Sequence, residues 1–140
     1  MKVRWDFFMK PQAIRYVFFI LCLSLLIGCG TGTSKVTIED LPDPLEAGWE
    51  GQPVCEVLEE NSEIRLLKCS FLPGVGHEEH YHDPHSGYTL TGGIFRITDS
   101  NGTRDVNVPT GTTWSNEAIT THQVLNIGET TAVFLIIEYK

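Results

Sequence analysis

Basic residues are scarce in this chain. Its 140 residues contain ten Lys and Arg against 18 Asp and Glu, which gives a formal net charge of −8. Residues 1–28 hold four of the basic residues and one acidic residue, so the remainder is more acidic than the chain as a whole. Such a surface repels nucleic acid and anionic headgroups, and it favours neutral or cationic ligands or a metal ion. An acidic surface that serves solubility alone would have the same composition.

The chain also lacks an apolar run long enough to cross a bilayer as a helix. The longest run, residues 16–27, has about a dozen residues, whereas a spanning helix needs roughly 20. Four basic residues precede this run, and Gly28-Cys29 follows it. This pattern is typical of a signal peptide over residues 1–28, and its end resembles the lipobox of bacterial lipoproteins, in which the cysteine, here Cys29, receives the lipid. The alternative is an uncleaved membrane anchor. Both place the domain outside the cytoplasm.

The residues after Cys29 predict a tether and then a domain. Residues 29–53 contain the lipidated cysteine, a flexible segment rich in Gly, Thr and Ser, and a surface wrap punctuated by Pro and Gly. No acidic residue follows Cys29 directly, so the resemblance to lipoproteins implies the periplasmic side of the outer membrane in a bacterium with two membranes. The lipid would then be the only link to the membrane. Residues 54–140 are expected to form one domain.

Cysteines are few, and the predicted export leaves two of the four. Cys22 lies in the signal peptide and Cys29 is the lipidation site, so Cys55 and Cys69 remain. They flank a predicted hairpin of strands 54–60 and 64–71. A three-residue loop would place them opposite each other, whereas a two-residue loop would place them on opposite faces. A disulfide suits an oxidising compartment, but these two registers leave it open.

No helical periodicity is present after residue 28, and short strands with turn signals take its place. Asn101-Gly102 predicts a tight turn between strands 94–98 and 103–108. Residues 130–139 are apolar on both faces, which predicts a central strand covered on both sides. Short strands at steady spacing favour an all-β, antiparallel sandwich or barrel.

Histidine is concentrated in one stretch: four of the five lie in residues 72–93, and the fifth is His122. His80 and His82 have the spacing that puts two side chains on one face of a strand. His85 follows after a short Asp-Pro turn. Neutral imidazole is the commonest metal ligand, so these residues predict a metal site.

The spacing of these histidines resembles the two motifs of the cupin superfamily, over residues 54–139. The first motif matches at Gly74, His80, His82, His85 and Gly92, and the second at Gly111, His122 and Asn126. His85 stands where the family has Glu, while Glu117 and Ile119 replace the Pro and Gly before the last histidine. The resemblance implies a small single-domain protein with an antiparallel jelly-roll β-barrel and a metal in its lumen. It also implies a homodimer.

On this resemblance His80, His82, His85 and His122 are the expected ligands. Imidazole ligands suit Fe, Zn, Ni or Cu. Three functions follow: an oxygenase, isomerase or lyase acting on a small molecule; a non-catalytic module that binds a small ligand or the metal; or a barrel with a purely structural metal.

Glu78 and Tyr88 are the candidate catalytic residues. Glu78 shares the strand parity of His80, which makes it either an inward base or a residue in water at the barrel mouth. Tyr88, Thr89 and Trp114 are expected to line the pocket. His77 has the opposite parity and is expected to be exposed.

Overall fold

The computed structural model describes residues 37–140. The predicted signal peptide, Cys29 and the tether as far as residue 36 lie outside this part of the chain. The described residues all belong to one compact unit. Within residues 37–140 no helix combines the length and apolar character needed to cross a membrane. The elements are one 3-10 helix and nine strands: η1 (Ile38–Asp40), β1 (Cys55–Glu60), β2 (Ile64–Phe71), β3 (Gly76–His82), β4 (His85–Thr91), β5 (Gly93–Asp99), β6 (Gly102–Val108), β7 (Thr113–Asn116), β8 (Thr120–Asn126) and β9 (Ala132–Tyr139).

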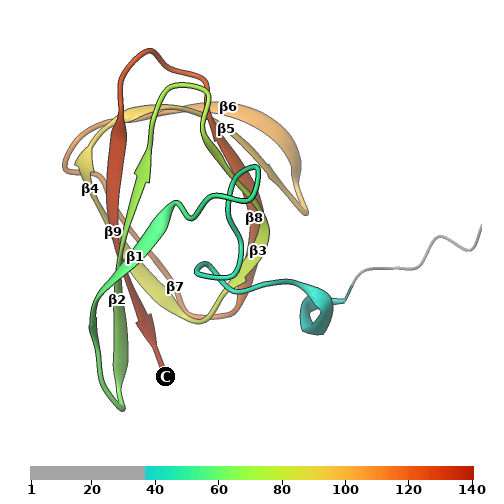
Figure 1. Cartoon of the computed structure of the whole chain (residues 1–140), viewed down its shortest axis with the longest axis vertical. Helices are drawn as coiled ribbons and strands as arrows, with labels where there is room; N and C mark the ends of the chain where they lie inside the picture. The colour runs from blue at the N-terminus through green and yellow to red at the C-terminus, as the bar shows by residue number, and fades with distance from the viewer. Residues whose placement is uncertain (1–36) are drawn as a thin grey trace, which may run out of the picture. The chain divides into compact units, whose positions relative to one another are not determined.

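The strands form two antiparallel sheets (Figure 1). One has the order β1-β2-β9-β4-β7 and the other the order β3-β8-β5-β6. The prediction of an all-β, antiparallel jelly roll with a single domain is therefore confirmed. Both motifs lie in this arrangement: the first spans β3 and β4 in different sheets, and His122 lies on β8 beside β3.

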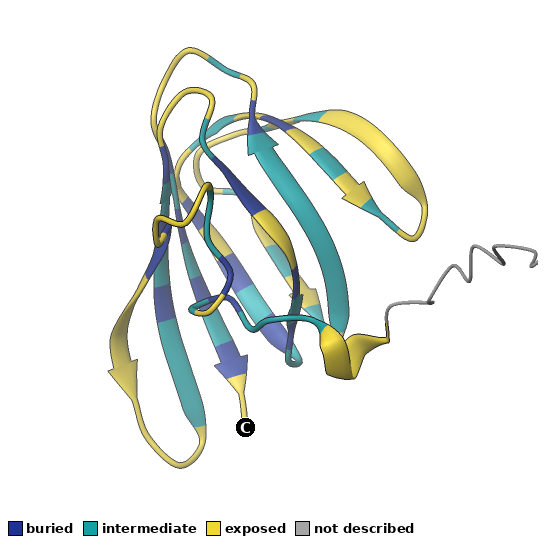
Figure 2. Ribbon diagram, turned by 45° about the vertical axis from the view of Figure 1, so that its right-hand side comes forward, coloured by how far each residue is buried: buried dark blue, intermediate teal, exposed yellow. Residues whose placement is uncertain are grey.

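Strand β9 is the middle strand of the five-stranded sheet, as the apolar run predicts. Buried and half-buried residues alternate along it, which Figure 2 shows on the strand that ends at the C-terminus. Phe71, Phe95 and Phe134 come from three strands and pack edge to face, with ring centroids 5.3 to 5.8 Å apart. This aromatic contact joins the two sheets, because Phe95 lies in the four-stranded sheet and the other two in the five-stranded sheet.

The first hairpin contains a β-bulge that sets the pairing of its cysteines. Near the turn Glu60 pairs with Arg65, and this register continued without change would set Cys55 opposite Ser70. A shift between Val57 and Glu59 moves the pairing by one residue, so Cys55 lies opposite Cys69. The two cysteines form a disulfide.

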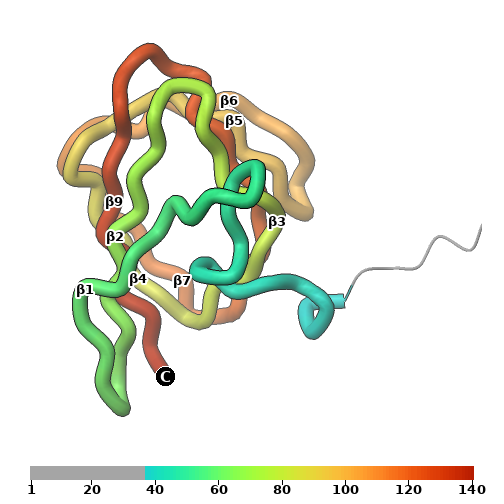
Figure 3. Tube along the Cα trace, in the orientation of Figure 1, coloured from blue at the N-terminus to red at the C-terminus, as the bar shows by residue number. Residues whose placement is uncertain are grey.

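The predicted wrap is present and covers the free edge of β3. The Tyr81 amide donates to the Pro42 carbonyl at 3.1 Å, and the Glu78 amide donates to the Gly48 carbonyl at 2.8 Å. Figure 3 shows this segment passing beside β3. Trp49 packs against Gly76, where an added Cβ would lie 2.6 Å from the indole ring. The wrap thus protects a sheet edge that would otherwise present unpaired backbone groups.

Candidate metal centre

Three histidines from two neighbouring strands meet between the sheets. His80 on β3 pairs directly with His122 on β8, and His82 follows two residues later on the same face of β3. One ligand nitrogen from each residue lies within 4.8 Å of the others. His80 and His82 are buried, with exposed fractions of 0 and 2%. The structure therefore brings together residues about forty positions apart, as the motif spacing predicts.

Hydrogen bonds fix which nitrogen of His80 and His82 is free. His80 Nδ1 lies 2.6 Å from the Glu78 carbonyl oxygen, and His82 Nδ1 lies 2.8 Å from Glu138 Oε1. Both oxygens accept hydrogen bonds, so each Nδ1 carries the proton and each Nε2 keeps a lone pair. The two Nε2 atoms are 2.9 Å apart. Two lone pairs at this distance repel each other unless a proton or a cation lies between them.

The electrostatics of the cluster favour neutral imidazoles at neutral pH. Burial, together with the neighbouring His80 and His85, lowers the pKa of His82 to about 2. Burial also lowers the pKa of His80, although its bond to the Glu78 carbonyl opposes the shift. Burial and the surrounding histidines hold the pKa of His122 well below its usual value. Three neutral imidazoles with facing lone pairs are a donor set that fits a transition metal ion.

Glu138 supports the cluster, and the sequence analysis missed it. Its Oε1 accepts from His82 Nδ1, while its Oε2 accepts from Arg65 Nε at 2.8 Å. Arg65 Nη1 in turn donates to Asp43 Oδ2 at 2.7 Å. Burial raises the pKa of Glu138, and the hydrogen bond from Arg65 opposes that rise. A carboxylate behind a histidine fixes the ring orientation and tautomer of a metal ligand. The alternation of side chains along a strand could have identified Glu138, because it lies two residues after Ile136 and four after Phe134 and therefore points to the same face of β9.

His85 lies beside the cluster, but both of its ring nitrogens are engaged. Its ring centroid is 4.8 Å from that of His82, and the residue is 2% exposed. His85 Nδ1 lies 2.8 Å from the Asp83 carbonyl oxygen, and His85 Nε2 lies 3.1 Å from Asn116 Nδ2. The Asn116 amide therefore donates to the nitrogen that would bind a metal. His85 as a fourth ligand stays a prediction, and it requires Asn116 to move away.

The expectation that His77 is exposed is wrong: it is 2% exposed. The reason is a register shift in β3 between His77 and His80, which places both residues on the inner face although they are three positions apart. His77 Nε2 lies 3.1 Å from the Pro44 carbonyl oxygen, and its ring lies on that of His80 with centroids 3.8 Å apart. Burial and the neighbouring His80 and His82 lower the pKa of His77 to about 3.

The two candidate catalytic residues lie on the outside. The bulge that turns His77 inward leaves Glu78 exposed, where its Oε1 accepts a hydrogen bond from the Glu50 amide at 3.2 Å. Of the two positions that parity allowed for Glu78, the structure therefore has the surface one. Tyr88 is 44% exposed, because β4 turns its odd-numbered residues inward, and it does not line the cavity beside the histidines. Trp114 lines that cavity as expected, whereas Thr89 is buried away from it.

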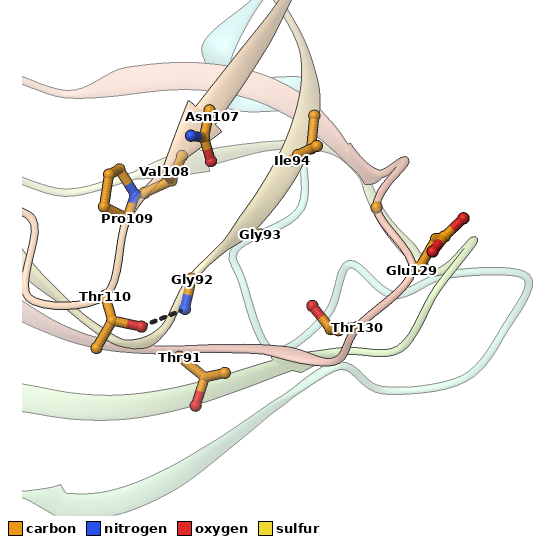
Figure 4. A pocket seen from close by; sticks show the side chains of 11 residues that line it. Thr91, Gly92, Gly93, Ile94, Asn107, Val108, Pro109, Thr110, Glu129 and Thr130 are labelled. Atoms are coloured by element: carbon orange, nitrogen blue, oxygen red, sulfur yellow. Dashed lines mark hydrogen bonds between the residues drawn. The ribbon is translucent and has the colours of Figure 1, made fainter.

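The histidine cluster opens onto a cavity of about 620 Å³. His82, His85 and His122 contribute to its wall, and aromatic and aliphatic side chains from both sheets form most of the rest. A second pocket of about 350 Å³ lies around Gly92 and Gly93, where the Gly92 amide donates to the Thr110 hydroxyl (Figure 4). Its lining contains no histidine. The metal-binding chemistry of the described residues therefore belongs to the larger cavity.

Comparisons with known proteins identify the fold. No family model matches the chain, and no curated protein matches it. A crystal structure of a cupin domain from Bordetella pertussis is similar, with 23% identity, a TM-score of 0.58, and coverage of 62% of this chain and 92% of that one. The polyketide cyclase RemF from Streptomyces resistomycificus is also similar, with 17% identity, a TM-score of 0.52, and coverage of 75% and 78%. These likenesses show that the chain has the cupin jelly-roll fold.

Proposed function

We propose that the protein binds one divalent transition metal ion through His80, His82 and His122. The observation that carries this proposal is the pair of Nε2 atoms 2.9 Å apart, each left with a lone pair by a hydrogen bond at its Nδ1. A cation that both nitrogens bind turns their repulsion into two favourable contacts, and His122 supplies the third donor from the adjacent strand. Imidazole donors favour Fe, Zn, Ni or Cu over Mg or Ca.

We further propose that this metal centre binds a small molecule in the cavity. Three protein ligands leave a coordination position open, which is the arrangement of catalytic and ligand-binding sites and not of closed structural ones. A metal ion bound there would supply Lewis-acid or redox chemistry. His82 and His122 both line the cavity, so a metal ion held by them would lie beside the space in which a ligand fits.

A non-catalytic binding module is the second candidate, and the cavity wall supports it. Among the described residues that line the cavity, the only carboxylate is Asp99, which accepts from Arg104 at 2.8 Å in an ion pair. General acid–base chemistry by a carboxylate therefore has no free group beside the histidines. If the protein is an oxygenase, isomerase or lyase, a metal ion held by His80, His82 and His122 would supply the chemistry that the cavity side chains lack.

We also propose that the chain is an exported lipoprotein, anchored through Cys29 on the periplasmic side of the outer membrane where the source has two membranes. The N-terminal charge and apolar pattern supports this location, and so does the Cys55–Cys69 disulfide, because disulfides persist in oxidising compartments. Its acidic composition supports the absence of a nucleic-acid partner. The homodimer remains a prediction from the resemblance.

Metal analysis of the purified protein tests the proposed centre. We expect one equivalent of metal in the unaltered protein, and loss of that metal in His82→Ala and in His122→Ala, with β-sheet circular dichroism retained. His77→Gln is the matched control: it replaces another buried histidine and keeps a donor for the Pro44 carbonyl, so it should retain the metal. Unchanged metal content in both alanine variants would refute the proposal.

A further inference from the structure

The cavity wall above the histidines is chiefly aromatic and aliphatic. Phe71, Phe95, Trp114 and Phe134 line it from both sheets. Aliphatic side chains of the same wall include Ile97, Val108, Val124 and Ile136, and polar side chains such as Asn116 and Thr121 also line it. Burying the apolar surface of a ligand against such a wall makes binding more favourable. Flat rings also pack well against aromatic side chains that are arranged edge to face.

Charge in the cavity is almost absent. Among the described residues that line it, Arg104 is the only Lys or Arg, and its Nη2 donates to Asp99 Oδ2 at 2.8 Å. The Arg104 side chain is 47% exposed, so this ion pair lies toward solvent and away from the buried histidines. A carboxylate or phosphate on a ligand would therefore find no free positive side chain, and only the metal ion would offset the cost of transferring it from water.

Thr120 supplies a hydroxyl without a partner next to the metal centre. It pairs with His82 across β3 and β8, and strand alternation places it on the same face as His122. Thr120 lines the cavity, yet its Oγ1 is buried and has no hydrogen-bond partner. Leaving a buried hydroxyl unpaired costs free energy, which a ligand oxygen in the cavity would recover.

We propose that the cavity binds a neutral, mainly aromatic small molecule that carries an oxygen donor group. The inference rests on the proposed metal centre: the oxygen group lies at the open metal position and accepts a hydrogen bond from the Thr120 hydroxyl, while the ring packs against the aromatic wall. The volume of about 620 Å³ lies within the usual range for pockets that enclose small organic ligands.

Calorimetric titration of the zinc-loaded protein tests the ligand class with two probes. 2,3-Dihydroxynaphthalene is uncharged in water at neutral pH and offers two phenolic oxygens on an aromatic body, whereas malonate is a dianion with no ring. We expect the naphthalene to bind at least about tenfold more tightly, because its rings are buried against the wall. Equal or tighter binding of malonate would overturn the inference. Protein that takes up zinc but binds neither probe would overturn only the ligand class, whereas failure to take up zinc would overturn the proposed centre.

Two threonine variants separate the role of Thr120 from a general effect of removing a hydroxyl. Thr120→Val should weaken binding of 2,3-dihydroxynaphthalene by about five- to tenfold, the worth of one hydrogen bond, with zinc content unchanged. Thr89→Val is the matched control, because the Thr89 Oγ1 is also buried without a partner but does not line the cavity. Unchanged affinity in Thr120→Val, or an equal loss in Thr89→Val, would contradict the assigned contact.

Discussion

Replacing Glu138 with Gln tests how the protein orients its metal ligands. The Glu138 carboxylate accepts from His82 Nδ1 at 2.8 Å and from Arg65 Nε at 2.8 Å. Gln keeps an oxygen that can accept from His82, but it removes the negative charge that makes the imidazole a stronger donor. Loss of a group of this kind typically lowers metal affinity by about 10- to 100-fold. We therefore expect Glu138→Gln to lower zinc affinity within that range, or by about 1.4 to 2.8 kcal/mol.

The same variant should destabilise the metal-free fold. Removal of one member of a buried ion pair costs about 3–5 kcal/mol when the other charge loses its only partner. Arg65 keeps Asp43 at 2.7 Å and its side chain is 15% exposed, so we expect a loss near or below the low end of that range, about 2–3 kcal/mol.

Competition with a chromophoric zinc chelator measures the affinity, and urea unfolding of the metal-free protein measures the stability. Glu56→Gln is the matched control, because Glu56 pairs with Lys68 on the surface with a side chain that is 62% exposed. It should change neither quantity measurably, since surface ion pairs contribute little. Zinc affinity that is equal in Glu138→Gln and in the unaltered protein would show that Glu138 does not orient His82.

Three further predictions follow from the same geometry. As the pH is lowered from 6 to 5, the free energy of unfolding of the metal-free protein, measured by urea titration, should fall by about 1 kcal/mol or more per pH unit. Imidazoles of the unfolded chain bind protons below pH 6.5, whereas His77 and His82 of the folded protein do not, because their pKa values are lowered to about 3 and 2. A flat profile would contradict the burial of these two residues as neutral groups. His85→Ala should keep one equivalent of metal by elemental analysis, and loss of the metal would favour the four-histidine set instead. Gly87→Ala should destabilise the protein by about 1–3 kcal/mol and shift the fluorescence of Trp114, because the new Cβ would lie 2.0 Å from the indole ring; unchanged stability and emission would show that the ring moves freely.

Local rules predicted the strands and the core of the site. Asn101-Gly102 predicted the β5–β6 turn, because tight hairpin turns need residues with positive φ angles. Gly102 has a φ angle of 99°. The i, i+2 spacing placed His80 and His82 on one face because strand side chains alternate. His122 was placed beside them by the motif resemblance and not by any local rule, since the pairing of β3 with β8 joins distant segments.

The errors on β3 have one physical source, the β-bulge. His77 was expected on the outside because parity counts residues, whereas a bulge in β3 adds one residue and inverts the parity. The same bulge leaves Glu78 exposed. A bulge depends on the partner strand, so a single strand does not reveal it. Glu138 is different: it was missed although its parity with Phe134 and Ile136 marked it as an inward charge that needs a partner.

Anomalous diffraction from crystals of the zinc-loaded protein, recorded at the zinc absorption edge, tests the central claim most directly. We predict one strong peak between the two sheets, on the inner face of β3 and β8, at roughly 2.0–2.1 Å from a ring nitrogen of each of His80, His82 and His122. A peak elsewhere, or none within reach of these three rings, would contradict the account.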